Sequence, residues 1–374
     1  MQIIDVKAVH VSIPLEKPYV FARGTMTAFD NVVVRIDTDE GIVGYGESAP
    51  LFNSPTGDAG TVAGWINEHA SNLIGTDPFD IELHVKRALE AAGGNVDCVA
   101  GIDVALWDVV GKVLGQPIFR LMGGKCQDPI AVDYTLSSAE PDEMVEYARK
   151  MHEQGFQGVV VKVTGKSVDQ GIAQVRAVRE ALPVECTVRV DCNGGFRRDG
   201  ALEFLNGIAG IGVELVEQPL PAEDLEGSRL CRAAGVPISL DEGLITQSDA
   251  IAVVREEACD IMNVKVPRVG GFVLAKRMAA IAEAAGMAVI VGGRTALEIS
   301  RAASRHLAAA TPGAVGIKHE GPGPASQALS DDVVAKRTTR EETCQAGGFV
   351  PVEQGPGLGI EIVWDKVERY AVAA

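Results

Sequence analysis

The stretch that decides the fold contains four apolar runs that each end in a charge: Thr187-Val-Arg-Val-Asp191, Val213-Glu-Leu-Val-Glu217, Ile238-Ser-Leu-Asp241 and Ile261-Met-Asn-Val-Lys265. The charges are 26, 24 and 24 residues apart, with a helical pattern in each interval. This is the period of a strand-loop-helix-loop unit. In such repeats the carboxyl ends of parallel strands meet on one face of a closed barrel. Three acids and one lysine are therefore predicted to share a site.

The same alternation extends on both sides of this stretch. Strands are expected at 129–136, 158–164, 187–193, 213–219, 237–243, 261–267, 288–294 and 315–319. Helices are expected at 141–154, 168–181, 199–209, 223–234, 247–256, 271–285 and 296–310. Eight strands are the number that closes a parallel barrel, so the pattern predicts an α/β protein with a TIM-like barrel.

The first part of the chain has a different pattern. Strand-like segments at 1–13, 31–37 and 42–47 predict an antiparallel meander, because the turn Thr38-Asp-Glu-Gly41 joins the last two. Helical patterns follow at 58–74, 78–92 and 97–115. The glycines and the proline between 115 and 124 mark a boundary near 125. We predict domains at 1–125 and 126–324, and a segment 325–374 that packs back on the first domain.

Composition narrows the class of protein. The chain has 374 residues with a net charge of −17, and it offers no basic stripe for phosphate neutralisation, so we expect no nucleic-acid partner. Its seven cysteines form no C-x-x-C pair, which indicates neither a disulfide framework nor a zinc site. We find no signal segment and no apolar run of the ~18 residues that a membrane span needs. The expected location is the cytoplasm, away from any membrane.

Seven motifs together resemble a known family: Gly-Ile-Asp-Val-Ala-Leu-Trp-Asp (101–108), Leu-Met-Gly-Gly (121–124), Val-Val-Lys-Val (160–163), Val-Asp-Cys-Asn (190–193), Glu-Gln-Pro (217–219), Leu-Asp-Glu (240–242) and Asn-Val-Lys (263–265). They are similar to the muconate lactonizing enzyme subgroup of the enolase superfamily. The resemblance implies an N-terminal α+β capping domain on a modified (β/α)7β barrel. It also implies abstraction of a proton next to a carboxylate, with bound Mg²⁺, or Mn²⁺ as the alternative metal.

The three acids suit that metal. Removal of a proton α to a carboxylate produces a dianionic enediolate, whose second negative charge requires strong electrostatic stabilisation. Carboxylates without sulfur or imidazole ligands favour a hard cation such as Mg²⁺. Asp191, Glu217 and Asp241 are therefore the predicted metal ligands. The alternative is that each acid only caps the helix that follows it.

Two lysines are the predicted acid/base residues. Strand alternation places Lys162 and Lys265 at corresponding depths on the second and sixth strands, nearly opposite each other in an eight-stranded barrel. A buried lysine beside a cation has a lowered pKa and can act as a base. The alternative is a structural ion pair between either lysine and the acids. Val160 stands where the resemblance leads us to expect a further lysine, so the surroundings of Lys162 differ from the family pattern.

Further candidates have supporting roles. Asn193 and Asn263 share the inward orientation of the acid and the lysine and could orient them. The resemblance implies that loops of the capping domain near 20–30 and 50–55 contact the substrate. The candidate substrate contacts are Arg23, Asn193, Arg294, His319 and Glu320. Glu298 begins a helix and is predicted to cap it.

The predicted reaction is racemisation or epimerisation of an amino-acid-like, small-molecule carboxylate, because two lysines supply one base for each face of the α-carbon. The same site could dehydrate a hydroxy acid or cycloisomerise a muconate-type acid. A binding protein without activity is disfavoured, since all three acids and both lysines are present. The resemblance also implies a homo-oligomer, which a monomeric mass by light scattering at micromolar concentration would contradict.

Overall fold

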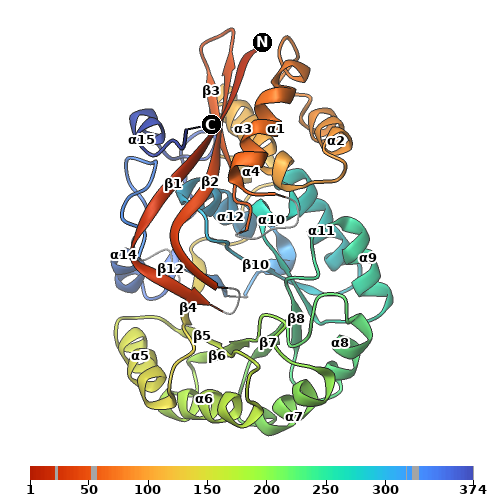
Figure 1. Cartoon of the computed structure of the whole chain (residues 1–374), viewed down its shortest axis with the longest axis vertical. Helices are drawn as coiled ribbons and strands as arrows, with labels where there is room; N and C mark the ends of the chain where they lie inside the picture. Colours follow the sequence, from red (N-terminus) through yellow and green to blue (C-terminus); the bar gives the residue numbers. More distant parts are fainter. Residues whose placement is uncertain (22–23, 52–56, 317, 322–327, 374) are drawn as a thin grey trace.

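The computed structural model describes residues 1–21, 24–51, 57–316, 318–321 and 328–373. It has an antiparallel sheet with helices in its N-terminal part and a larger, curled parallel sheet ringed by helices (Figure 1). We call the first part the cap and the second the barrel. In the described part of the chain no helix is both long enough and apolar enough to cross a membrane.

The cap combines a three-stranded sheet with a layer of helices. Its strands are β1 (Ile3–Phe21), β2 (Gly24–Thr38) and β3 (Val43–Ser48). Its helices are α1 (Ala59–His69), η1 (Ala70–Asn72), α2 (Ile81–Ala91), α3 (Asp97–Val113) and α4 (Ile118–Leu121). Helix α3 packs so closely on β3 that a Cβ at Gly46 would lie only 2.0 Å from the carbonyl oxygen of Gly101. The glycine therefore permits this close helix-sheet contact.

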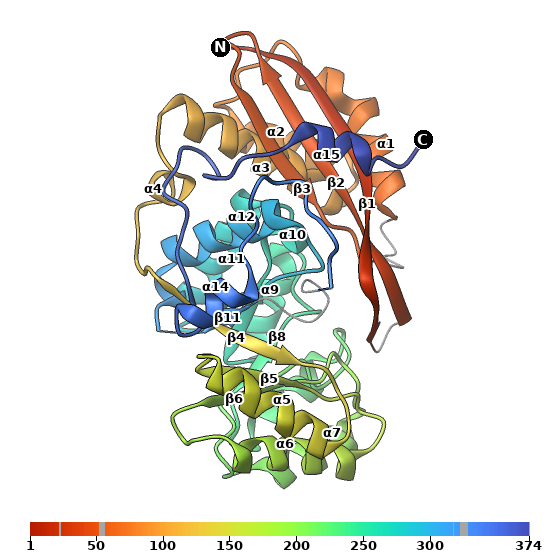
Figure 2. The same ribbon diagram turned by 90° about the vertical axis from the view of Figure 1, so that its left-hand side faces the viewer.

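The hairpin of β1 and β2 is longer than the predicted strands 1–13 and 31–37. It extends from the cap sheet toward the barrel, as both views show (Figures 1 and 2). Much of the region 20–30, expected as a loop, is strand, since β2 begins at Gly24. The continuation of β1 beyond residue 13 was not predicted because the segment contains Pro14 and Pro18, and proline is rarely found within a paired strand.

The barrel confirms the predicted α/β fold. Its strands are β4 (Ile130–Leu136), β5 (Gly158–Lys162), β6 (Thr187–Asp191), β7 (Leu215–Glu217), β8 (Ile238–Leu240), β9 (Ile261–Val264), β10 (Ala288–Val291) and β11 (His319–Glu320). They pair in parallel in the order β10-β9-β8-β7-β6-β5-β4-β11. The helices between them are α5 (Pro141–Glu153), α6 (Val168–Ala181), α7 (Arg198–Ile208), α8 (Leu225–Arg232), α9 (Gln247–Arg255), α10 (Val266–Val269), α11 (Phe272–Ala284), α12 (Glu298–Ala310) and η2 (Pro312–Ala314).

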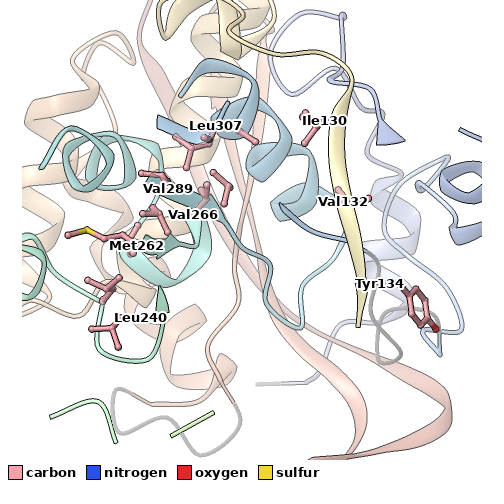
Figure 3. Packing of buried hydrophobic residues seen from close by; sticks show 14 of the residues in the cluster. Ile130, Val132, Tyr134, Leu240, Met262, Val266, Val289 and Leu307 are labelled. Carbon is pink, nitrogen blue, oxygen red and sulfur yellow. The ribbon is translucent and has the colours of Figure 1, made fainter. Parts of the chain in front are cut away.

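Alternation along the strands separates the apolar core from the charged interior. In β6, Val188 and Val190 are buried apolar residues, whereas Arg189 and Asp191 line the cavity inside the curl. Strand side chains alternate between two faces, so one face packs on the helices and the other carries charge. Figure 3 shows the same apolar layer farther round the sheet, where Leu240, Met262 and Val289 lie beside one another.

The segment after 328 contacts both parts of the molecule. It contains α14 (Arg340–Gln345), β12 (Phe349–Val350) and α15 (Trp364–Arg369). Isolated bridges join Leu15 to Leu329 and Val11 to Ala371 on the cap side, while β12 pairs antiparallel with β4 of the barrel. The division of the chain at 125 and 324 stays a prediction.

Two acids of the cap hold the starts of two barrel helices. Asp103 accepts hydrogen bonds from the backbone N–H groups of Phe272 (2.5 Å) and Val273 (3.2 Å) in α11. Glu47 accepts from the N–H groups of Leu297 (2.8 Å) and Ser300 (2.9 Å) at the start of α12. These N–H groups have no partner within their own helix, so buried carboxylates from the cap satisfy them.

Candidate active site

The strand register brings the predicted acids to one face of the sheet. Asp191 on β6 pairs with Glu217 on β7, and Glu217 pairs with Ser239 on β8. Asp241 lies two residues beyond Ser239 and therefore points to the same side. Lys162 on β5 is the register partner of Asp191. All of these side chains except Ser239 line a single cavity of about 700 Å³, together with Lys265, which follows β9.

Asp191 contacts Asn193, which follows the end of its own strand, and Lys162 on the neighbouring strand β5. Lys162 Nζ donates to Asp191 Oδ2 and, at 3.1 Å, to Asn193 Oδ1. The backbone N–H of Asn193 donates to Asp191 Oδ1 at 2.8 Å. This contact accompanies a left-handed backbone at Asn193, with φ of 45°. The predicted orienting role of Asn193 thus has a geometric basis, since the amide contacts both members of the pair.

Glu217 and Asp241 have partners from farther along the chain. Asn263 Nδ2 donates to Glu217 Oε1 at 3.1 Å. Lys265 Nζ donates to Asp241 Oδ2 at 3.0 Å, and Arg268 Nη1 donates to the other oxygen, Oδ1. Burial alone would raise the pKa of Asp241, but the adjacent Arg268 and Lys265 lower it below its ordinary value.

Three residues of this cluster were not predicted as site residues. Arg268 lies one helical turn after Lys265, in α10. Glu242 accepts from Asn193 Nδ2 at 3.1 Å, and its pKa is raised to about 7 by burial and by the charges of Asp241 and Asp191. In the sequence, the i,i+3 spacing from Lys265 could have indicated Arg268. The dipeptide Asp241-Glu242 could have indicated Glu242.

Tyr19 is the third. It lies on β1 of the cap and lines the cavity together with Met26, Phe29 and Leu51. These four are the cap residues that contact the cavity in the described part of the chain. Nothing in the local sequence distinguishes Tyr19 from an ordinary strand residue.

The predicted substrate contacts have mixed outcomes. Arg294 lines the cavity but is buried and donates to Asp97 Oδ1 of the cap at 2.9 Å; burial lowers its pKa. His319 on β11 also lines the cavity, and its Nδ1 accepts a hydrogen bond from the N–H of Val291 on β10 at 3.0 Å. Strands β10 and β11 are the first and last in the order of the sheet. Burial lowers the pKa of His319 to about 3. The imidazole of His319 is therefore neutral near pH 7, and it joins β11 to β10 through this hydrogen bond.

The other two candidates give less information. Arg23 lies outside the described residues, as do residues 52–55 of the second predicted loop. The backbone of Glu320 belongs to β11, but its side chain is outside the described part of the structure. Glu298 does not cap α12 as predicted; it is buried and pairs with Arg305 Nη2 at 2.6 Å.

The donor chemistry of the acids fits a divalent cation. Asp191, Glu217 and Asp241 are buried carboxylates at adjacent strand ends in one cavity, and hard cations prefer such oxygen ligands. They are not arranged as a ready ligand set, because among the described residues no three histidine, cysteine or acidic side chains come together in that way. Lysine, arginine and asparagine groups hold the carboxylates instead.

Comparison with known proteins agrees with this fold and site. Residues 3–123 match the family model for the mandelate racemase / muconate lactonizing enzyme N-terminal domain, and residues 143–366 match that of the enolase C-terminal domain-like family. The chain therefore belongs to the mandelate racemase / muconate lactonizing enzyme family of the enolase superfamily, a family of enzymes.

Individual relatives cover almost the whole chain. An L-Ala-D/L-Glu epimerase of Clostridium acetobutylicum is 34% identical over 96% of this chain and 99% of its own length. A cis-3-hydroxy-L-proline dehydratase of Roseibium aggregatum is 32% identical over 83% of this chain and 85% of its own. The structure of a dipeptide epimerase from Enterococcus faecalis with Mg and L-Leu-L-Tyr has a TM-score of 0.89 at 28% identity, covering 96% of this chain and 100% of that one.

Proposed function

We propose that this enzyme abstracts the proton α to a carboxylate in an Mg²⁺-dependent reaction and racemises or epimerises an amino-acid-like acid. The observation that carries the proposal is the placement of Lys162 and Lys265. Lys162 ends β5 and Lys265 directly follows β9; these strands are four positions apart in the curled eight-strand sheet, and both lysines line the same cavity. Two amines on opposite sides of a cavity can reach the two faces of one carbon.

Asp191, Glu217 and Asp241 would hold the metal, with Mn²⁺ as an alternative to Mg²⁺. The cation would supply positive charge to the substrate carboxylate, which makes the α-proton more acidic. The protein contributes the burial of these groups, because charges interact more strongly in a water-poor cavity than in bulk solvent. The epimerase relatives support the general type of reaction.

The lysines would move the protons. At the start of a turnover one lysine is a neutral amine and the other is an ammonium. The amine takes the α-proton from one face, and the ammonium returns a proton to the opposite face, so the configuration is inverted and the two lysines exchange protonation states. Asn193 keeps Lys162 oriented at 3.1 Å, and Asp241 does the same for Lys265 at 3.0 Å.

The dehydratase relative supports a second candidate. If one lysine took the α-proton and the other gave a proton to a leaving hydroxyl, the product would be dehydrated. A muconate-type cycloisomerase would use the same groups to open or close a lactone. The mass of the product separates dehydration, which loses one water, from racemisation, which leaves the mass unchanged in H₂O. A lactone has the mass of the open acid, so NMR of the product, which detects ring closure, separates cycloisomerisation from racemisation.

The experiment is exchange in D₂O with a panel of amino acids, N-acyl amino acids, dipeptides and hydroxy acids, read by mass. We expect deuterium at the α-carbon of both stereoisomers of at least one compound. Lys265→Ala should lose exchange with one stereoisomer and keep some with the other, and Lys162→Ala should do the reverse.

The matched control is Lys86→Ala, which removes a lysine whose side chain is 69% exposed on the cap. It should exchange both stereoisomers as the wild type does. Normal exchange by both cavity-lysine variants, or a dehydrated product alone from the wild type, would contradict the two-base racemase.

A further inference from the structure

The loop between β10 and α12, residues 292–297, forms one wall of the active-site cavity. Five consecutive residues of this loop, 292–296, line the cavity. The loop carries none of the proposed metal ligands and neither of the two lysines. Its backbone therefore sets the shape of the cavity on this side without supplying a reacting group.

The cap sheet turns one face toward this loop. Phe29 and Asn31 are two residues apart on β2, so their side chains lie on the same face, and Phe29 lines the cavity. Glu47 on β3 lies opposite Val33 of β2, two residues beyond Asn31, and so shares that face. Strand β3 lies beside α12 (Figure 2). Asn31 and Glu47 are thus neighbours on the barrel side of the cap sheet.

Asn31 and Glu47 together hold the backbone of the loop. Asn31 Nδ2 donates to Glu47 Oε1 at 2.5 Å and to the carbonyl oxygen of Thr295 at 3.3 Å. The same Glu47 oxygen accepts from the N–H of Leu297 at 2.8 Å. A side-chain amide has two N–H donors, and here one serves the cap and the other the loop. Because Asn31 is only 2% exposed and Glu47 1%, these bonds do not compete with bulk water.

We propose that Asn31 is a positioning residue for the substrate cavity, which holds the β10–α12 loop from the cap, so that cap and barrel together set how tightly the substrate is bound. The loop then binds the group attached to the α-carbon, because it lines the cavity without contributing a base or a metal ligand. Contacts to such a group are equally strong in the bound substrate and in the transition state, so their loss raises KM and leaves kcat unchanged. This inference rests on the proposed function.

The first test needs no substrate. Hydrogen–deuterium exchange of the peptides that cover 291–300 measures how firmly the loop backbone is held. In Asn31→Ala these amides should exchange about tenfold faster, on the order of the loss of one or two hydrogen bonds. Asn31→Ser should give an intermediate rate, since one O–H serves only one of the two acceptors, and it replaces Asn31→Ala in every comparison if that variant does not fold. An unchanged exchange rate overturns the inference.

The second test uses the compound whose α-proton the wild type exchanges. Asn31→Ala should raise KM for both stereoisomers roughly tenfold and keep kcat within about twofold, which is the result of losing uniform binding. Affinity for Mn²⁺, measured by calorimetry, should stay within about twofold, whereas changes that reach the ligands through their neighbours cost about 10- to 100-fold. An unchanged KM, or a lower kcat together with weaker Mn²⁺ binding, overturns the inference.

The matched control is Asn67→Ala. Asn67 is a cap asparagine whose amide also bonds to backbone, at 2.8 Å to both the N–H and the carbonyl oxygen of Ala8 on β1, and it does not line the cavity. It should change neither loop exchange nor KM, and equal effects of the two variants overturn the inference. Faster loop exchange in Asn31→Ala alone, without any wild-type α-proton exchange, would reject the proposed function and leave the hold of the cap on the loop standing.

Discussion

At the scale of single residues, the site is a cluster of opposite charges that the protein has removed from water. Asp241 illustrates it best, since Lys265 and Arg268 each occupy one of its oxygens and all three side chains are buried. Removing one partner of a buried ion pair leaves a charge that nothing compensates, which costs more than the pair itself contributes. Asp241 therefore serves both stability and the proposed metal site.

We predict that Asp241→Asn removes turnover and lowers the free energy of unfolding by about 3 kcal/mol, because two buried cations lose their carboxylate. Affinity for Mn²⁺, measured by calorimetry, should fall by more than about 100-fold, since changes outside the ligand set alone cost about 10- to 100-fold. Circular dichroism should still show a folded barrel at 25 °C.

Asp260→Asn is the matched control, because Asp260 pairs with Arg232 and neither residue lines the cavity. It should keep Mn²⁺ binding and turnover. Full activity of the wild-type protein after treatment with a chelator would contradict the metal assignment.

At the scale of elements, the cap and the barrel are joined by carboxylates placed at helix starts. Asp103 sits at the start of α11, and a Cβ on Gly271 would lie 2.4 Å from its carboxyl group, so the glycine makes room for the acid. Helix α11 follows α10, which carries Arg268, and Lys265 lies just before α10. The cap thus fixes a helix that follows Lys265, one of the two proposed bases, by a few residues.

We predict that this contact makes stability depend on pH. Burial raises the pKa of Asp103 to about 7, although the two N–H groups lower it, whereas its unfolded value is about 3.9. The folded state therefore binds more protons between these values, and the contribution of Asp103 to stability is greatest below pH ~4 and is lost as the pH rises toward 7. The slope should be at most about 1.4 kcal/mol per pH unit.

Urea unfolding of the wild type and of Asp103→Asn from pH 4 to pH 8 measures the effect. The quantity compared is the free energy of unfolding of the wild type minus that of the variant. The difference should fall as the pH rises and level off above 7. Asp58→Asn is the control, because Asp58 caps α1 with a lowered pKa and so titrates below this range. A difference for Asp103→Asn as flat as that for Asp58→Asn would contradict the prediction.

At the scale of the whole molecule, the C-terminal segment ties the cap sheet together after the chain has left the barrel. The Trp364 ring of α15 lies 5.3 Å from Lys7 Nζ and 5.1 Å from Arg35 Cζ, and it packs near Tyr45 on β3. The chain end then bridges to β1 (Figure 2). The same segment also contacts the β1–β2 hairpin, where Leu329 bridges to Leu15.

We predict that Trp364→Ala lowers the free energy of unfolding by about 2 kcal/mol, because two cation–π contacts of about 0.5–1 kcal/mol each are lost together with apolar packing. The C-terminal segment should also become more sensitive to limited proteolysis. Trp364→Phe, which keeps an aromatic face, should lose less than half as much. Equal stability of Trp364→Ala and the wild type would show that the segment is held elsewhere.

The alternation of apolar and charged residues was enough to predict much of this molecule. Most barrel strands and helices could be read from the sequence because each charge closes a buried run, as at Asp191 and Glu217. The last strand, expected at 315–319, was misplaced, because 315–316 form a turn after η2 and β11 is His319–Glu320. The hairpin beyond Pro14 could not, because the irregular pairing near Pro18 breaks the alternation that marks a strand. Arg294 and His319 both line the cavity, and their contact with substrate stays a prediction; their partners, a cap acid and a neighbouring strand, could not be read from the sequence.

The sequence by itself determined the repeated strand-helix unit, the order of the charges and the face they share, because these depend on periods of two and about 3.6 residues along a local stretch. The tertiary structure alone decided which groups meet. It brought Arg268 to Asp241 and Asp103 to the start of α11. Such contacts join residues 27 to 169 positions apart, and they arise only when the sheet curls and the cap packs on it.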